Sequence, residues 1–362
     1  MASQPLKHIS FLAVFIIATF GIAAQTAPPP YEKDFTVESV ARGLDSPWAL
    51  AFPSREGALV TLKGGLMEFI DLKTGARSTV PGLPRIRSVG QGGLLDLALA
   101  PDFEESREIF LSFSEERDGK YGTSVARARF LENPARIEGW KVIFSANNVS
   151  GSTLHFGSRL AFDRDGFLYV TVGERNERQR ARDPSDHGGK TLRLDRNGRG
   201  QIFTSGHRNA QGLTLNPSSG KLWLHEHGPR GGDEVNILKA GADYGWPLVS
   251  YGREYSGSAV GDGASSAPGI TEPLLYWVPS IAPSGMAFYS GSAFPAWNGD
   301  LLVGALAGME LRRVDLEGEK VLSQTSYLKG WARIRDVRLG PDSSIYILTD
   351  GAKGGLWRLV PS

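Results

Sequence analysis

The sequence predicts an all-β protein, a six-bladed β-propeller built from four-stranded antiparallel blades. Three observations predict this fold. A sequence pattern of two short apolar strands occurs six times, and a turn of Pro, Asp, Asn, Ser or Gly separates the two strands. Copies of this pattern recur at roughly fifty to seventy residues, near the length of one blade. Because a blade buries its faces only against its neighbours, six copies imply a closed ring around a central channel.

The six copies follow one another along the chain after an N-terminal segment. Their first apolar strands begin at Trp48, Leu97, Leu160, Leu213, Met286 and Val337. The turn residues between the two strands favour tight chain reversal, so each copy is expected to form a hairpin within one blade. The longest interval separates the fourth copy from the fifth and contains a loop at 257–269 that is rich in Gly, Ser and Ala. Long loops on a rigid scaffold often carry function.

Residues 1–24 are predicted to be a secretory signal peptide. They have a positively charged start at Lys7, an apolar stretch at 11–22 and a small residue for cleavage at Ala23. The apolar stretch is short for a membrane span, so no stable span is expected, and a retained N-terminal anchor is the alternative. The mature protein, residues 25–362, is expected to be a single propeller domain in a bacterial periplasm.

Composition narrows the possible functions. The chain of 362 residues exceeds the usual size of one hydrophobic core, but each interface between blades can be a small core of its own. Its formal net charge of +1 offers no broad basic surface, so nucleic acid is not expected as a partner. The chain contains no cysteine, which excludes disulfides and thiol chemistry.

Polar side chains of kinds common in binding sites stand immediately before the first strands of several copies. If the copies are equivalent, these positions converge on one end of the channel and face a single pocket. The residues are Gln91, His155, Arg208, Asn209, Arg333 and Arg335. Several arginines in one pocket indicate a ligand with several carboxylates or phosphates, because a guanidinium binds such groups bidentately.

Structural roles remain open for the same residues. His155 could cap a strand or bond a neighbouring backbone group. Arg333 and Arg335 project to one side of a strand and could form a stripe of surface ion pairs.

The end of the fourth copy suggests a metal site. His225 and His227 alternate like two zinc ligands on one strand face, but no third ligand is evident. Exposed carbonyls of Gly228 and Pro229, with Asp233 and Glu234 nearby, are hard oxygen donors that suit calcium better. A purely structural turn is the remaining alternative.

Together, these motifs resemble the soluble pyrroloquinoline-quinone-dependent sugar dehydrogenases, especially their bacterial aldose sugar dehydrogenase branch. The resemblance runs from about Leu44 to the C-terminus, and the matching segments are 90–96, 155–162, 206–213, 226–234, 244–247, 281–289 and 333–338. Two positions depart from the family pattern. Asp243 stands where an amide is expected, and Ala307 stands where the glucose-specific relatives have a lysine near the cofactor. The loss of this cation is expected to weaken quinone binding or to shift its contacts to backbone groups around Leu306.

The resemblance implies a role for each matching residue. The quinone, bound without a covalent link, would be contacted by Gln91, Arg208, Asn209, Tyr255, Leu306, Ala307, Arg333 and Arg335. The Gly228 and Pro229 carbonyls would hold the Ca²⁺ that polarises the quinone. Glu234 and the Tyr244 carbonyl would hold a second, structural Ca²⁺. His155 would be the catalytic base, and Arg208 would stabilise the developing negative charge.

The activity that follows is oxidation of an aldose sugar at its anomeric carbon to a lactone, with hydride transfer to the quinone. A neutral imidazole suits removal of the hydroxyl proton near neutral pH. The sequence does not identify the electron acceptor or the oligomeric state. Two alternatives remain open: a calcium-dependent propeller lactonase or esterase, and a non-catalytic sugar-binding propeller.

Overall fold

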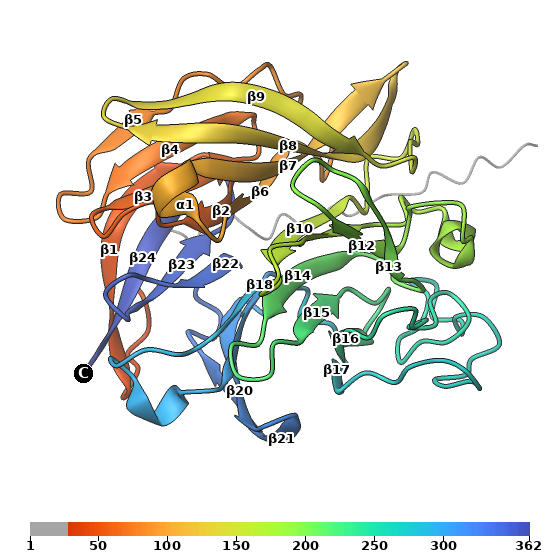
Figure 1. Ribbon diagram of the computed structural model, residues 1–362. Helices are drawn as coiled ribbons and strands as arrows, with labels where there is room; N and C mark the ends of the chain where they lie inside the picture. Colours follow the sequence, from red (N-terminus) through yellow and green to blue (C-terminus); the bar gives the residue numbers. More distant parts are fainter. Residues whose placement is uncertain (1–27) are drawn as a thin grey trace, which may run out of the picture.

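Six antiparallel sheets of four strands each follow one another around a ring in the computed structural model, which describes residues 28–362 (Figure 1). The prediction of a six-bladed β-propeller is therefore confirmed. The predicted signal peptide lies outside the described residues. Among residues 28–362, no helix combines the length and the apolar character needed to cross a membrane.

The first three blades are built from consecutive strands. They comprise β2 (Pro47–Ala51), β3 (Gly57–Leu62), β4 (Leu66–Asp71) and β5 (Arg77–Thr79); β6 (Leu94–Leu99), β7 (Glu108–Arg117), β8 (Lys120–Glu132) and β9 (Ala135–Ser145); and β10 (Gly157–Phe162), β11 (Leu168–Val172), β12 (Lys190–Leu194) and β13 (Gly200–Thr204). A short helix, α1 (Phe103–Ser106), joins β6 to β7, and a 3₁₀ turn, η2 (Arg178–Arg182), follows β11.

The last three blades complete the ring. They comprise β14 (Ala210–Leu215), β15 (Leu222–Glu226), β16 (Asp233–Ile237) and β17 (Leu275–Trp277); β18 (Pro283–Phe288), β19 (Leu301–Ala305), β20 (Glu310–Glu317) and β21 (Lys320–Tyr327); and β22 (Ile334–Leu339), β23 (Ile345–Thr349) and β24 (Gly354–Pro361) with β1 (Phe35–Leu44). A 3₁₀ turn, η3 (Pro295–Trp297), lies between β18 and β19. The N-terminal strand β1 pairs antiparallel with the C-terminal strand β24, so the two chain ends close the ring together (Figure 1).

Each of the six copies of the sequence pattern forms the first two strands of a blade. The first strands, β2, β6, β10, β14, β18 and β22, contact one another in that order and return to β2. They therefore line the centre of the ring, and the segments that precede them lie at one mouth of the channel.

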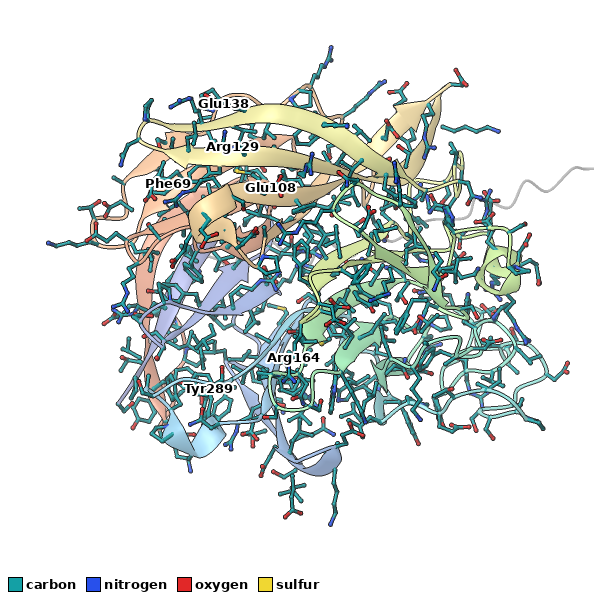
Figure 2. All side chains as sticks on the ribbon, in the orientation of Figure 1. Phe69, Glu108, Arg129, Glu138, Arg164 and Tyr289 are labelled. Carbon is teal, nitrogen blue, oxygen red and sulfur yellow. The ribbon has the colours of Figure 1, made fainter. Side chains whose placement is uncertain are left out.

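The apolar side chains divide into six main clusters, one between each pair of neighbouring blades. Between the first and second blades, for example, Phe69 stacks on Phe130 with ring centroids 6.1 Å apart. Figure 2 shows Phe69 facing the strands of the next blade, and Tyr289 belongs to the cluster between the fifth and sixth blades. Burial is thus distributed over the interfaces, which explains how a chain of this length folds without one large core.

Candidate active site

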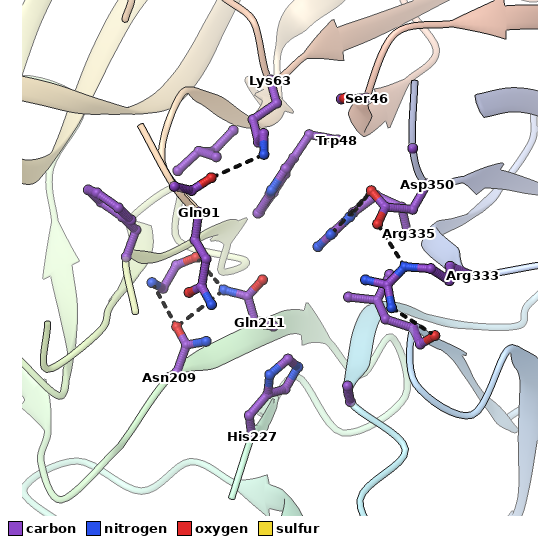
Figure 3. Close-up of a pocket in the computed structure, with 17 residues that line it drawn as sticks. Ser46, Trp48, Lys63, Gln91, Asn209, Gln211, His227, Arg333, Arg335 and Asp350 are labelled. Atoms are coloured by element: carbon purple, nitrogen blue, oxygen red, sulfur yellow. Dashed lines mark hydrogen bonds and ion pairs between the residues drawn. The ribbon is translucent and has the colours of Figure 1, made fainter. Parts of the chain in front are cut away.

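Two adjoining cavities open at the mouth of the channel. The smaller, of about 390 Å³, is shown in Figure 3, and the larger has a volume of about 850 Å³. They share Gln91, Asn209, His227 and Ala282. Between them they are lined by eleven of the predicted site residues: Gln91, His155, Arg208, Asn209, Gly228, Pro229, Tyr255, Leu306, Ala307, Arg333 and Arg335. The structure thus brings together residues from five blades.

A local irregularity at the start of every first strand explains this convergence. The pairing register shifts between the first and second strands of all six blades, close to the N-terminal end of the first strand. A β-bulge of this kind bends the strand and re-aims its side chains. In the third blade the shift follows His155, whose own backbone is left-handed with φ 53°. Gly173 permits this arrangement, because a Cβ there would lie 2.0 Å from the His155 carbonyl oxygen.

His155 is held at both its backbone and its ring. Its backbone N–H donates to Gln91 Oε1 at 2.8 Å, and its Nδ1 lies 2.5 Å from Glu174 Oε1. Burial lowers the pKa of His155 below its ordinary value, Glu174 opposes this effect, and the nearby Arg208 adds to it. Because Nδ1 is engaged by Glu174, the other ring nitrogen, Nε2, remains to exchange a proton with a ligand in the larger cavity.

Sequence reasoning missed Glu174, although the repeats contain a signal for it. Glu174 follows the second strand of the third blade, and Glu226 ends the second strand of the fourth, where it meets His207 Nδ1 at 2.7 Å. Both His–Glu pairs are separated by 19 residues in the chain. Equivalent positions in consecutive repeats therefore make the same contact.

The smaller cavity carries an excess of positive charge. Asp350, which follows the second strand of the sixth blade, pairs with Arg333 Nε at 3.1 Å and with Arg335 Nη2 at 3.3 Å. Burial would raise the pKa of Asp350, but Arg335 and Arg333 outweigh it and hold that pKa below its ordinary value. Lys63, which sequence reasoning also missed, donates to the Gly90 carbonyl at 3.1 Å. Three cationic side chains thus share the smaller cavity with one carboxylate (Figure 3).

Leu306 lines the smaller cavity and Ala307 lines the larger one. The Leu306 carbonyl accepts a hydrogen bond from Arg333 Nη1 at 3.3 Å. Ala307 contributes no charge to the larger cavity, and Lys63 supplies a cation to the smaller cavity from another blade. Tyr255 is 73% exposed and lies at the rim of the larger cavity.

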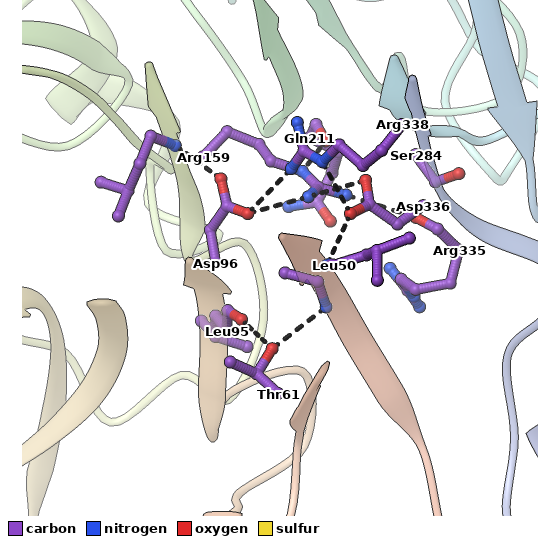
Figure 4. Close-up of polar contacts among 12 residues, drawn as sticks. Leu50, Thr61, Leu95, Asp96, Arg159, Gln211, Ser284, Arg335, Asp336 and Arg338 are labelled. Atoms are coloured by element: carbon purple, nitrogen blue, oxygen red, sulfur yellow. Dashed lines mark hydrogen bonds and ion pairs between the residues drawn. The ribbon is translucent and has the colours of Figure 1, made fainter. Parts of the chain in front are cut away.

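At the centre of the ring, the buried Arg159, Asp96 and Asp336 and the half-buried Arg338 form a charge network that we call the floor network (Figure 4). Arg159 Nη1 lies 3.1 Å from Asp96 and 3.2 Å from Asp336, and Arg338 lies 3.2 and 3.0 Å from the same two carboxylates. Each aspartate also accepts a backbone N–H from a neighbouring blade, Asp96 from Leu160 at 2.7 Å and Asp336 from Leu50 at 3.0 Å. This floor network joins β2, β6, β10 and β22.

Arg208 lies against the segment predicted to hold calcium. Its Nη1 donates to the carbonyls of Gly228 at 3.0 Å and His227 at 3.2 Å. A carbonyl has two lone pairs, so Gly228 retains one acceptor site. Asp233 accepts hydrogen bonds from the backbone of Gly228 and from residues 280–282. It therefore shapes the turn and is not a free calcium ligand.

Glu234 and Tyr244 lie together in a small pocket beside Arg208, with Glu226. Burial raises the pKa of Glu234 well above its ordinary value, and the neighbouring Glu226 raises it further. Asn236 Nδ2 bridges the two carboxylates at 3.3 Å each, while its buried Oδ1 has no hydrogen-bond partner among the described residues. The carboxylates of Glu226 and Glu234 are oxygen donors of the kind that a hard cation prefers.

The two histidines of the zinc alternative do not form a metal site. His225 is fully buried beside Gly212, and burial lowers its pKa well below the ordinary value. His227 Nε2 donates to the Pro283 carbonyl at 2.6 Å. Within residues 28–362, no group of three or more His, Asp or Glu side chains is arranged to hold a metal ion.

The chain is similar to several known proteins. Residues 44–358 match the glucose/sorbosone dehydrogenase family model. The chain is 41% identical to the aldose sugar dehydrogenase YliI of Escherichia coli K12, covering 90% of this chain and 92% of that protein. It is 26% identical to quinoprotein glucose dehydrogenase B of Acinetobacter calcoaceticus, covering 97% and 94%.

Two solved structures are also similar to this one. The apo form of the soluble E. coli aldose sugar dehydrogenase matches with a TM-score of 0.86 at 40% identity, covering 91% of this chain and 100% of that one. The pyrroloquinoline-quinone-bound form of an aldose sugar dehydrogenase from Streptomyces coelicolor matches with a TM-score of 0.77 at 26% identity, covering 92% and 100%.

The floor network predicts a large loss of stability when one carboxylate is removed. Asp96→Ala deprives Arg159 and Arg338 of a counter-ion inside the ring, so the free energy of unfolding is expected to fall by about 3–5 kcal/mol. Urea denaturation measures the change. The control is Glu138→Ala, which removes an exposed partner of Arg136 (Figure 2) and is expected to change stability by less than about 0.5 kcal/mol. Equal stability of both variants would contradict the assigned role.

The contacts of His155 predict an unusual titration. Its pKa, measured by NMR of the ring signals, is expected below 6.5, because burial disfavours the imidazolium. The Glu174 carboxylate stabilises the imidazolium, so Glu174→Gln is expected to lower the pKa of His155 further and leave that of His187 unchanged. A rise in the pKa of His155 in this variant would show that Glu174 does not pair with it.

Proposed function

The chain belongs to the glucose/sorbosone dehydrogenase family, and we propose that it oxidises an aldose sugar at its anomeric carbon to a lactone, using pyrroloquinoline quinone and Ca²⁺. The observation that carries this proposal is the shared pocket. An imidazole held by a carboxylate and three cationic side chains meet at one mouth of the channel. The imidazole suits proton removal from a sugar hydroxyl. The three cationic side chains suit a ligand with several carboxylates.

The smaller cavity fits the proposed cofactor by charge and by size. Pyrroloquinoline quinone carries several carboxylates, and Lys63, Arg333 and Arg335 outnumber the single carboxylate that lines the cavity with them. Its volume of about 390 Å³ lies within the range of small-molecule sites. Gln91, Asn209 and the backbone of Leu306 would contact the ring system. When bound, the quinone supplies a two-electron acceptor, and Ca²⁺ supplies a Lewis acid beside it.

His155 would act as the general base. Glu174 holds Nδ1, which leaves Nε2 to accept the proton of the sugar C1 hydroxyl. Because burial lowers the pKa of His155, the imidazole is neutral and ready to accept a proton at pH 7. Glu174 then stabilises the imidazolium that forms, and it fixes the ring orientation throughout.

Arg208 would stabilise negative charge that develops on the ligand during the reaction. Its guanidinium is anchored on the carbonyls of His227 and Gly228, so it is already oriented before a ligand binds. A preorganised cation of this kind stabilises a transition state without reorganisation.

Calcium would occupy two places. The Gly228 and Pro229 carbonyls line the larger cavity beside Arg208 and would hold the ion next to the cofactor. Glu234 and the Tyr244 carbonyl would hold a structural ion in the small adjoining pocket, where it would offset the repulsion between Glu226 and Glu234.

The lactonase alternative has less support. Such a site needs converging carboxylate and amide ligands for its calcium, whereas Asp350 is the one carboxylate among the residues that line the two cavities, and it is paired with two arginines.

We also propose export to the periplasm, which rests on the composition of residues 1–24.

Reconstitution tests the activity. Purified apoprotein with pyrroloquinoline quinone and Ca²⁺ is expected to reduce an artificial dye in the presence of an aldose. His155→Ala is expected to lower kcat by about 10²–10⁴-fold, the usual worth of a general base, while quinone binding followed by absorbance is retained. His187→Ala, a histidine outside both cavities, is the control. Full turnover in His155→Ala would refute the base, and lactone hydrolysis without quinone would support the alternative enzyme.

Calcium is expected to stabilise the apoprotein through Glu234. A ligand at one hundred times its Kd adds about 2.7 kcal/mol to the free energy of unfolding, so Ca²⁺ should raise Tm. Because the carboxyl of Glu234 must lose its proton first and its pKa is raised, the rise should be smaller at pH 5 than at pH 7.5. Glu234→Gln should remove most of the Ca²⁺-induced increase in Tm, whereas the control Glu104→Gln, at an exposed position, should retain that increase. An unaltered rise in Glu234→Gln would place the ion elsewhere.

A further inference from the structure

Two arginines that have no role in the chemistry above lie side by side at the larger cavity. Arg230 and Arg253 form an antiparallel bridge, with Arg230 N–H donating to the Arg253 carbonyl at 2.9 Å and Arg253 N–H donating to the Arg230 carbonyl at 3.2 Å. Residues directly opposite in such a pair project their side chains to the same face. Both arginines are exposed and both line the larger cavity together with His155.

Neither guanidinium has an ion-pair partner within residues 28–362. The neighbouring carboxylates are engaged elsewhere: Glu254 pairs bidentately with Arg178 at 2.5 and 2.7 Å, and Glu272 accepts the Tyr251 hydroxyl at 2.5 Å. No Asp or Glu stands among the residues that line the larger cavity, whereas three arginines do: Arg208, Arg230 and Arg253. This cavity therefore carries unbalanced positive charge.

The positive charges of Arg230 and Arg253 repel each other at this place, which costs free energy. Like charges directly opposite each other on a strand pair are destabilising, and no protein carboxylate offsets them here. An anion between the two guanidiniums would relieve the repulsion. Arginine binds carboxylate and phosphate oxygens with two parallel N–H donors, so two adjacent arginines form a strong site for either group.

The backbone around the pair is braced. Arg253 also bridges Ala259, and the adjacent Glu254 is tied to Arg178, whose guanidinium lies 5.2 Å from the Trp246 ring. On the other side, Gly232 is left-handed with φ 72°, and a Cβ there would lie 2.3 Å from the Gly252 nitrogen. Close packing of the two segments fixes the backbones of the two arginines relative to each other, which reduces the entropy lost on binding.

We propose that Arg230 and Arg253 form an anion subsite that selects aldoses carrying a carboxylate or a phosphate at the end remote from C1. The inference rests on the proposed function, because His155 in the same cavity would take the C1 hydroxyl. The subsite is distinct from the cationic group of the smaller cavity, where Lys63, Arg333 and Arg335 would meet the cofactor. It narrows the substrate class to uronic acids or sugar phosphates.

Substrate competition tests the subsite in the reconstituted enzyme. For at least one of glucuronate and glucose 6-phosphate, kcat/KM in the wild type is expected to exceed that for glucose more than tenfold. The better of the two substrates shows whether the subsite prefers a carboxylate or a phosphate. Arg253→Gln and Arg230→Gln are each expected to lower the ratio of kcat/KM for the anionic sugar to that for glucose at least tenfold, mainly through KM. The matched control is Arg129→Gln, an exposed arginine on β8 that lines neither cavity (Figure 2). Added salt should lower the ratio in the wild type.

A second readout separates the subsite from the cofactor site. The Kd for pyrroloquinoline quinone, from absorbance titration, is expected to stay within twofold of wild type in Arg253→Gln and to rise at least tenfold in Arg335→Gln. A rise in both variants would overturn the subsite by making Arg253 a cofactor ligand. The subsite would also be overturned if the ratio of kcat/KM for the anionic sugar to that for glucose were near one in the wild type and equally unchanged in Arg129→Gln and Arg253→Gln.

Failure of the proposed function gives a different pattern. If no aldose is oxidised, calorimetric titration of the apoprotein with glucuronate and with glucose 6-phosphate still measures the subsite. Binding that Arg253→Gln abolishes would support it, and absence of binding in the wild type would overturn it.

Discussion

The rest of the structure depends on the buried charge network at the centre of the ring. Arg159, Arg338, Asp96 and Asp336 are taken out of water together, which costs free energy unless every charge is matched and every remaining donor is bonded. Here both aspartates serve two cations and also accept a backbone N–H from an adjacent blade. Arg159 reaches further, donating to the Gln211 carbonyl at 2.7 Å and to the Arg335 carbonyl at 3.3 Å. The floor that fixes the position of the blades therefore also fixes the backbone of a residue in the candidate cofactor site.

The repeated blades place equivalent positions at the same mouth of the channel, and the different residues at these positions give the site its chemical groups. Every first strand begins with a pairing irregularity, so each blade offers a re-aimed residue at the same mouth of the channel. Acidic residues at the ends of second strands then hold those residues in place. Glu174 holds His155, Glu226 holds His207, and Asp350 holds Arg333 and Arg335. The same kind of contact thus orients the proposed base in one blade and the proposed cofactor-binding arginines in another.

The fold and the convergence of the site could be predicted from the sequence, because both follow from a visible repeat. Once the copies were recognised, equivalent positions had to meet at one end of the channel, which is where His155, Arg208 and Arg335 lie. The supporting residues could not be predicted in the same way. Glu174, Lys63 and Asp350 end or follow second strands, where an acidic or basic residue is usually solvated, and their importance depends on which side chain the next blade brings opposite. The engagement of the Gly228 carbonyl by Arg208 is likewise a tertiary contact with no mark in the local sequence.

The central claim is that His155 and the arginines of the smaller cavity, Arg333 and Arg335, face the same bound quinone. A crystal structure of the chain grown with pyrroloquinoline quinone and Ca²⁺ tests it most directly. The account predicts density for a flat tricyclic ligand in the cavity of Figure 3, with its carboxylates on Arg333 and Arg335, a cation at the Gly228 carbonyl and His155 Nε2 facing the open side of the ligand. Density for the quinone on the outer surface of the ring, or in this cavity with the His155 ring turned away from it, would contradict the account.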